Sequence, residues 1–358
     1  MTDSSEMRGG IVRRIDAAGG RPSASGEGRI GPLMALPRML QEFGVEPRSV
    51  LHEACLSPRL FNSADNTVSQ EAICRLLSVC AARTGRADFG LQVGARFSLP
   101  NFGLLGEIMR NSATAAEAIR MLILHLHFYD RLAVPLLYTA SPANVFLGYV
   151  PQHPAMDGIS HLLDAAIAVA YRTMRELCGP AWQVQDVQFS HRRPASAESY
   201  RRLFGQGVHF DAEMSGLVFA SSWLDQRVVG ANPALFRELT EALVVSESGW
   251  PISLAEQAQC IMLRLLHGGA VSSAGVAQLF GISERTLRDR LRAEGTSMQQ
   301  LLAATRFELA RHLLEDTELP LSRIAGALCY ADPAVFSRAF HGWAGVSPRQ
   351  WRSVNRKR

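Results

Sequence analysis

Three arginines toward the carboxyl end of the chain, Arg285, Arg288 and Arg338, have the side chain and the spacing needed to read the edges of bases. A guanidinium presents a planar fork of N–H donors that matches O6 and N7 of guanine in the major groove of DNA. Arg285 and Arg288 would be neighbours on one helix face, because residues at i and i+3 lie side by side. Arg338 occupies the corresponding place in a second, similar segment. These residues can recognise bases only if helices hold them on an outer surface.

The segments around these arginines repeat one design about 48 positions apart, in residues 276–291 and 324–340, if the second turn is one residue longer. Each copy has a short apolar helix, a tight turn, a polar cap residue and a second helix. Ser283 and Asp332 can accept hydrogen bonds from the first turn of the second helix, and Pro333 stands where a missing N–H has no cost. The pattern predicts two helix-turn-helix motifs.

The second helix of each copy has one apolar stripe. Leu287 and Leu291 recur at i and i+4 in the first copy, as Phe336 and Phe340 do in the second. We expect these four, with Trp343 and Trp351, to form the core. The residues off the stripes, which we expect to face a major groove, are Arg285, Arg288 and Arg292 in the first copy and Ser337, Arg338 and His341 in the second.

One long helix is predicted between the two motifs, from Thr296 to Glu315. Its apolar residues Met298, Leu302, Leu309 and Leu313 are expected on a common face. Twenty residues at a helical rise of about 1.5 Å span roughly 30 Å, close to the ~34 Å between successive major-groove faces. The connector is long enough to place both motifs on one side of a duplex.

Residues from about 253 to 356 resemble the DNA-binding domain of AraC/XylS-family transcription regulators. The resemblance rests on Ile324-Ala325, the run from Tyr330 to Phe340, Trp343, Gly345-Val346-Ser347-Pro348 and Trp351-Arg352. Beside the arginines and the cap Ser283, it implies DNA contacts by Glu284, Thr286 and Asp289 in the first motif and by Pro333, Ala334 and Ser337 in the second. Arg292, Arg306, Arg349 and Arg352 are expected to contact phosphates or to form ion pairs within the domain.

Cys329 departs from the family pattern, which usually has glycine in this turn. If the turn requires a positive φ, a cysteine there is strained. Its thiol is either structural or a redox switch, and the sequence shows no charged partner that would hold a thiolate.

Composition supports two domains and places the excess positive charge in the second. The 358 residues carry 37 Lys and Arg against 33 Asp and Glu; residues 250–358 hold 14 against 9, and residues 1–249 hold 23 against 24. A basic surface favours contact with phosphates. We expect a disordered leader at 1–29, a first domain at 30–245, a linker at 246–252 and the repeat-bearing domain at 253–358. Scattered cysteines and the lack of a long apolar run indicate a cytoplasmic protein rather than a membrane protein.

The first domain has mixed helical and strand patterns without a repeating βαβ order. Helices are expected at Leu33 to Phe43, Ser69 to Arg83, Thr114 to Arg131 and His161 to Cys178, and strands at Leu132–Tyr138, Val145–Val150, Val184–Phe189, Val208–Phe210 and Leu217–Ala220, with a turn at 141–144. The expected fold is an α+β N-terminal sensing domain joined to an all-α C-terminal domain with two helix-turn-helix motifs.

This first domain resembles the arabinose-binding-type N-terminal domain found in one branch of the same family. The residues that carry the resemblance are Phe102-Gly103-Leu104-Leu105-Gly106, Ser112-Ala113-Thr114, Glu117-Ala118, the run from Tyr200 to Gly205 and Val208-His209-Phe210-Asp211. It implies a module for effector sensing or self-association. His125 and Tyr129, one helical turn apart, are candidates for an effector pocket, with hydrogen-bonded core positions as the alternative. His125 and His127 would point apart on a helix, which disfavours a metal site.

The sequence thus indicates a bacterial transcription factor that binds double-stranded DNA sequence-specifically. The resemblance further implies a homodimer, a small-molecule effector and contact with RNA polymerase. No cofactor is expected, and no nucleophile elbow, phosphate-binding glycine loop or metalloprotease helix is present. A ligand-independent DNA binder and a DNA-tethered enzyme remain the alternatives.

Overall fold

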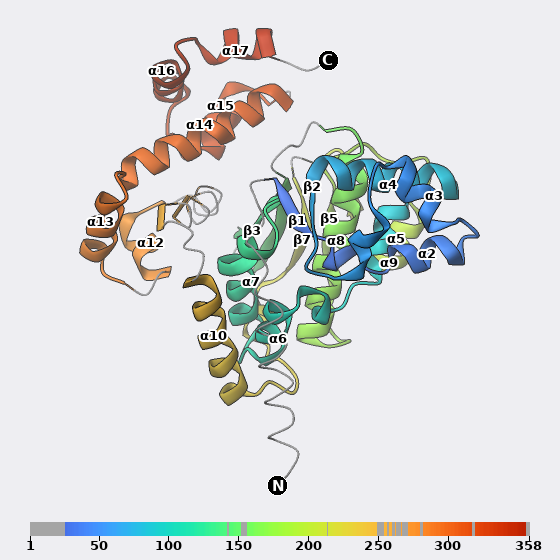
Figure 1. The fold of residues 1–358 in the computed structure, drawn as a ribbon. Helices are drawn as coiled ribbons and strands as arrows, with labels where there is room; N and C mark the ends of the chain where they lie inside the picture. Colours follow the sequence, from blue (N-terminus) through green and yellow to red (C-terminus); the bar gives the residue numbers. More distant parts are fainter. Residues whose placement is uncertain are drawn as a thin grey trace. The chain divides into compact units, whose positions relative to one another are not determined.

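The computed structural model describes residues 26–141, 143–151, 156–212, 214–248, 254–255, 258–259, 262, 266, 271–279, 282–316 and 319–355. The chain forms two compact units, Met1–Pro251 and Ile252–Arg358, which Figure 1 shows in blue to yellow and in orange to red. The division falls within the expected linker. The first three linker residues, 246–248, nevertheless belong to the last turn of helix α10 (Pro233–Ser248).

The N-terminal unit is built on a mixed five-stranded sheet in the order β3-β4-β7-β5-β6. The strands are β3 (Ala133–Ser141), β4 (Asn144–Pro151), β5 (Asp186–Gln188), β6 (Val208–His209) and β7 (Ser215–Ala220). β3 and β4 form an antiparallel hairpin closed by the Ser141–Asn144 pair, and β7 pairs antiparallel with both β4 and β5. β5 and β6 are parallel. The predicted α+β class is confirmed.

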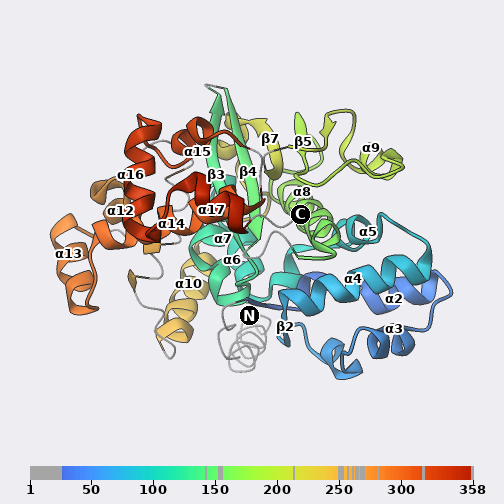
Figure 2. The ribbon, with the colours of Figure 1, turned by 90° about the horizontal axis from the view of Figure 1, so that it is seen from above.

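Helices make up most of the rest of this unit. They are η1 (Gly31–Leu33), α2 (Leu36–Glu42), α3 (Pro47–Glu53), η2 (Pro58–Asn62), α4 (Gln70–Thr84), α5 (Phe89–Ala95), η3 (Leu99–Phe102), α6 (Leu104–Asn111), α7 (Ala115–Tyr129), α8 (Ile159–Cys178), α9 (Glu198–Phe204), η4 (Ser221–Asp225) and α10. α8 lies between the sheet and helices α4 and α5 (Figure 2). In the part of the chain that the structure describes, no helix combines the length and apolarity needed to span a bilayer.

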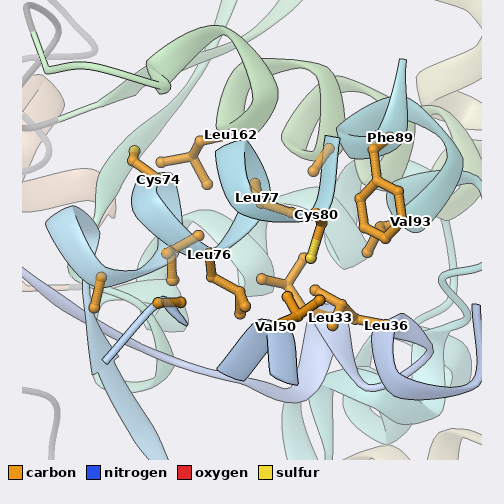
Figure 3. Packing of buried hydrophobic residues seen from close by; sticks show 14 of the residues in the cluster. Leu33, Leu36, Val50, Cys74, Leu76, Leu77, Cys80, Phe89, Val93 and Leu162 are labelled. Atoms are coloured by element: carbon orange, nitrogen blue, oxygen red, sulfur yellow. The ribbon is translucent and has the colours of Figure 1, made fainter. Parts of the chain in front are cut away.

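Two glycines allow α5 to pack closely on α8. A Cβ atom at Gly90 would overlap the carbonyl oxygen of His161, and one at Gly94 would overlap that of Ala165. The two helices therefore meet backbone to backbone, which places α8 against the helical half of the unit. Next to this contact, residues from η1, α2, α3, α4, α5 and α8 form a core whose side chains include Leu33, Leu36, Val50, Leu76, Leu77, Phe89 and Leu162 (Figure 3).

A separate two-stranded ribbon joins β1 (Glu27–Arg29) to β2 (Thr67–Ser69) in antiparallel register. The expected disordered leader is therefore wrong for residues 27–29; residues 1–25 lie outside the described part. The same strand, β1, also bonds to the residues that follow α7: Gly28 forms a bridge with Asp130, and the Arg131 N–H donates to the Glu27 carbonyl at 2.9 Å. These backbone bonds fix a segment whose composition gives no strand signal.

The C-terminal unit is helical among its described residues. Its helices are α12 (Ser273–Leu279), α13 (Glu284–Ala293), α14 (Met298–Asp316), α15 (Leu321–Ala327), α16 (Pro333–Ala344) and α17 (Pro348–Asn355). The second half of α14 packs with α15 and α16 around Leu309, Leu314, Ile324, Phe336 and Phe340. The single long connector helix between the motifs is thus present, shifted by one or two residues from the expected bounds.

The buried face of α14 differs from the expected one. Leu301, Thr305, Leu309 and Leu314 are buried, whereas Met298, Leu302 and Leu313 are half-buried. Thr305 tolerates burial because its hydroxyl donates to the Leu301 carbonyl at 2.8 Å. Of the four residues expected on one face, Leu309 is buried, and the buried face also includes the polar residue Thr305, which an apolar pattern does not predict.

Candidate nucleic-acid interface

The first helix-turn-helix consists of α12 and α13. Ser283 caps α13, because its Oγ accepts from the N–H of Thr286 at 3.1 Å. Leu287 and Leu291 are fully buried, as expected from their spacing. This burial fixes the rotation of α13 and so decides which of its side chains face solvent.

The outer face of α13 carries the residues expected to contact DNA. Those exposed are Ser283, Glu284, Arg285, Arg288, Asp289 and Arg292, and Thr286 is half-buried. Arg285 lies 3.9 Å from Asp289 (Nε to Oδ2), with 88% of the arginine side chain and 61% of the aspartate side chain exposed. A pair this exposed contributes little stability, so the Arg285 guanidinium can exchange this partner for another acceptor.

The residue after α13, Glu294, ties this motif to the start of the unit. Its two carboxylate oxygens accept from the backbone N–H groups of Leu254 and Ala255, each at 2.8 Å. The carboxylate satisfies N–H groups that have no helical partner at the beginning of a helical segment. The sequence gives no local signal for this role of Glu294, because the contact to Leu254 joins residues 40 positions apart.

The second helix-turn-helix consists of α15 and α16. Asp332 caps α16 by accepting from the N–H of Ala334 at 2.6 Å, and Pro333 begins the helix, as expected. Phe336 and Phe340 are fully buried. Pro333, Ala334, Arg338 and His341 are exposed, while Ser337 is half-buried and donates to the Pro333 carbonyl at 2.8 Å. Trp343 and Trp351, expected in the core, are only half-buried and pack at its edge.

Cys329 has a φ of 58°, the left-handed conformation that glycine adopts more easily. Its thiol donates to the Leu266 carbonyl at 2.8 Å, and the Tyr330 N–H bonds to the Ala325 carbonyl at 2.9 Å to close the turn. The departure from glycine thus places a non-glycine residue in the left-handed region while keeping the turn intact. The thiol has a structural contact within the domain.

The four arginines expected to contact phosphates or to form ion pairs separate into two groups. Arg306 donates to the Leu328 carbonyl at 3.0 Å and stacks on the Tyr330 ring, and Arg352 donates to the carbonyls of Leu314 and Leu319. Arg306 and Arg352 thus form hydrogen bonds within the domain that stabilise the second motif. Arg292 and Arg349 are exposed.

The N-terminal unit contains a cavity of about 90 Å³ between α7, α8, β3, β4 and the end of β1. Neither His125 nor Tyr129 is among the residues that line it. The buried ring of Tyr129 packs against the guanidinium of Arg29, whose Cζ lies 4.4 Å from the ring centre. Arg29, which was not expected from the sequence, itself lines the cavity. Of the two expected pocket residues, Tyr129 contacts a lining residue, whereas His125 is not among the lining residues.

Two helix-turn-helix motifs, each with a capped second helix that exposes arginine and joined to each other by one long helix, define a DNA-binding regulator. Residues 44–228 match the model of the arabinose-binding domain of AraC transcription regulators, and residues 276–353 match a helix-turn-helix domain model. The chain belongs to the AraC family of transcription regulators, and it is a DNA-binding protein.

Relatives of this family match over nearly the whole chain. The HTH-type transcriptional regulator VirS of Mycobacterium tuberculosis is 27% identical over 321 residues, covering 88% of this chain and 93% of VirS. The ornithine utilization regulator of Pseudomonas aeruginosa is 27% identical over 323 residues, covering 89% and 94%. Among solved structures, the transcriptional regulator CdpR from P. aeruginosa aligns with a TM-score of 0.43 at 21% identity, covering 86% of this chain and 96% of CdpR.

Proposed function

We propose that α13 and α16 are the recognition helices and that they enter successive major grooves on one face of a duplex. The observation that carries this proposal is the exposure of Arg285, Arg288 and Arg338 on the second helices of two motifs that the continuous helix α14 joins. The 19 residues of α14 span roughly 28 Å at a rise of about 1.5 Å per residue. The three arginines read bases, with guanine as the favoured partner.

The neighbouring exposed residues complete the two surfaces. Ser283, Glu284, Thr286 and Asp289 flank the arginines on α13, where Asp289 competes with DNA for Arg285. Pro333 and Ala334 present small apolar groups that fit thymine methyls, and Ser337, Arg338 and His341 follow along α16. Arg292 and Arg349 contact phosphates, which fix the register without reading sequence.

The N-terminal unit controls this activity. A small molecule bound in the unit, or self-association into a homodimer, alters how two protomers present four recognition helices and so changes recruitment of RNA polymerase. The cavity supports a binding role because small-molecule sites are enclosed and mostly apolar with few polar groups. A symmetric dimer would favour paired half-sites.

The proposed role is regulatory rather than catalytic. One histidine–carboxylate pair among the described residues is His191 with Asp164, whose carboxylate is 2% exposed and also accepts from the Tyr200 hydroxyl at 2.8 Å. The other nitrogen of His191, Nδ1, is hydrogen-bonded to the Arg192 carbonyl at 2.9 Å. Both ring nitrogens are therefore engaged in holding the fold, which supports a structural role.

Selection from a random DNA library by the full-length protein tests the proposal. We expect enriched sites with two contacted segments about one helical turn apart. Arg288→Ala and Arg338→Ala should each lose about 1–3 kcal/mol at these sites and relax one base preference. Arg202→Ala is the matched control, because Arg202 is exposed on the N-terminal unit and pairs only with a neighbouring side chain on its helix, Glu198, in the described structure.

Two results would overturn this assignment. A uniform loss of affinity across all sequences would make the substituted arginine a phosphate contact. Failure to enrich any sequence would leave only non-specific binding. Insertion of five base pairs between the two segments supplies an independent check, because it turns one groove away by about half a helical turn and should abolish simultaneous contact.

A further inference from the structure

The cavity of the N-terminal unit has almost entirely hydrocarbon walls. Side chains that line it include Leu33, Leu122, Leu126, Leu147, Leu162 and Val169. Water is poorly suited to such a space, because a buried water needs two to four polar partners. The preferred occupant therefore has an apolar body.

One charged side chain borders this apolar space. Arg29 ends β1, lines the cavity and has only 5% of its side chain exposed. Its Nη1 donates to Asp65, and its guanidinium carbon lies 4.4 Å from the centre of the Tyr129 ring. Its Nε and Nη2, however, have no hydrogen-bond partner among the residues that the structure describes. Buried donors without acceptors are unfavourable, so a ligand that accepts from both would be stabilised.

These two nitrogens form one edge of the guanidinium, with N–H bonds that point in the same direction. That edge matches the two oxygens of a carboxylate and binds them through a pair of parallel hydrogen bonds. We propose that the cavity binds a small monocarboxylate with a hydrocarbon body, whose carboxylate is held by Nε and Nη2 of Arg29. This assignment rests on the effector control proposed above and names its chemical class.

Other ligand classes fit the lining less well. A phosphate monoester carries nearly two negative charges, whereas the described lining offers one guanidinium, already paired with Asp65. A pentose has hydroxyl groups along its length, while the other hydrogen-bonding side chains that line the described cavity are Asp130, Tyr149 and Thr173. Most sugar hydroxyls would therefore face hydrocarbon and lose their hydrogen bonds to water.

The Asp130 carboxyl, which also lines the cavity, does not repel an anion strongly enough to prevent its binding. Its removal from bulk water raises the pKa to about 7, which the hydrogen bond from the Leu132 N–H opposes only in part. Near neutral pH a large fraction of the molecules thus carries a neutral Asp130, which can donate a hydrogen bond. The Thr173 hydroxyl, also without a partner among the described residues, supplies another donor on the wall.

Calorimetric titration of the full-length protein with hexanoate tests the assignment without any substitution. Hexanamide, hexan-1-ol and hexylamine share its hydrocarbon body, and L-arabinose tests the sugar class. We expect hexanoate to bind at one site per chain, and the other four compounds to bind at least about tenfold more weakly, because they lack the paired carboxylate oxygens. Butanoate and octanoate test how the cavity limits the length of the body.

Three variants locate the site. Arg29→Gln should weaken hexanoate binding at least about tenfold and leave hexan-1-ol binding unchanged. Asp65→Asn removes the same ion pair but keeps the guanidinium, so it should retain hexanoate binding and controls for damage to the β1 ribbon. Ala166→Leu should block every ligand by filling the cavity, since Ala166 lines it. Circular dichroism verifies that each variant is folded.

The outcomes separate the ligand class from the regulatory role. Equal binding of hexanoate and hexan-1-ol, hexanoate binding by Arg29→Gln at wild-type affinity, or absence of alkanoate binding would overturn the carboxylate assignment. If hexanoate binds but leaves affinity for the selected DNA unchanged, the carboxylate site stands and effector control fails. If arabinose binds and alters that affinity, effector control stands and the carboxylate class fails.

Discussion

The Nε2 atom of His191 lies 2.9 Å from the Oδ1 atom of Asp164, a carboxylate that is almost fully buried on helix α8. Burial lowers the pKa of His191, but the hydrogen bond to Asp164 and the charge of that carboxylate, together with the Arg192 carbonyl and the charge of Asp211, more than offset the effect, so the net pKa is raised. The pair joins the loop after β5 to the helix behind the sheet.

The raised pKa of His191 makes the N-terminal unit less stable at higher pH. The protonated imidazole is favoured by folding, so its contribution is complete below about pH 6.5, the unfolded pKa, and is lost as the pH rises through the folded pKa. We expect His191→Gln to flatten this part of the curve. Thermal unfolding of both proteins from pH 5.5 to 8.5 measures the difference; parallel curves would show that His191 does not gain a proton on folding.

Cys329 should be less favourable than glycine on conformational grounds, because its φ is 58°. Cys329→Gly and Cys329→Ala both remove the thiol contact to Leu266, but only alanine keeps a Cβ in the left-handed region. We expect the glycine variant to be more stable than the alanine variant by about 1 kcal/mol. Chemical denaturation of the two variants tests this order. An equal or higher stability of the alanine variant would contradict the argument.

Glu294 should stabilise the C-terminal unit through its two hydrogen bonds to Leu254 and Ala255. We expect Glu294→Ala to cost about 0.5–2 kcal/mol, because two backbone donors at a helix start exchange a charged acceptor for water. Glu294→Gln keeps one acceptor oxygen and should restore part of the loss. Denaturation followed by tryptophan fluorescence provides the measurement. Glu308→Ala is the control, because the Glu308 side chain is exposed on α14. Similar stabilities of Glu294→Ala and the control would show that the cap is not needed.

The sequence predicted elements whose signals are local. Capping residues and i, i+4 apolar pairs identified α13 and α16, and long periodic runs identified α4, α7 and α8 to within a few residues, except that α7 ends at Tyr129 rather than at Arg131. Two short apolar runs on either side of a turn predicted β3 and β4, although Ser141 and Asn144, expected in the turn, pair with each other at the strand ends. In each case a few consecutive residues decide the conformation.

Features made by distant residues could not be predicted in this way. The ribbon of β1 and β2 has three residues in each strand, too few to show alternation, and its pairing partners are about 40 positions apart. Arg29 lines the cavity only because η1 and the segments α7, α8 and the β3–β4 hairpin, which are distant from it in sequence, form the other walls. Glu294 likewise acts on a segment 40 positions earlier. The candidate DNA surface could be predicted from the sequence because its residues lie on single helices. The cavity could not, because its walls come from segments far apart in the chain.

The ribbon of β1 and β2 has a consequence for how such regulators diverge. Arg29, the residue proposed to recognise the ligand's charge, lies on a three-residue strand outside the five-stranded sheet. The strand is nevertheless bonded to the segment between α7 and β3, through the Gly28–Asp130 bridge and the Arg131 N–H. If Arg29 recognises the ligand, a substitution at this one position would change the ligand class without touching the residues of the DNA-binding helices.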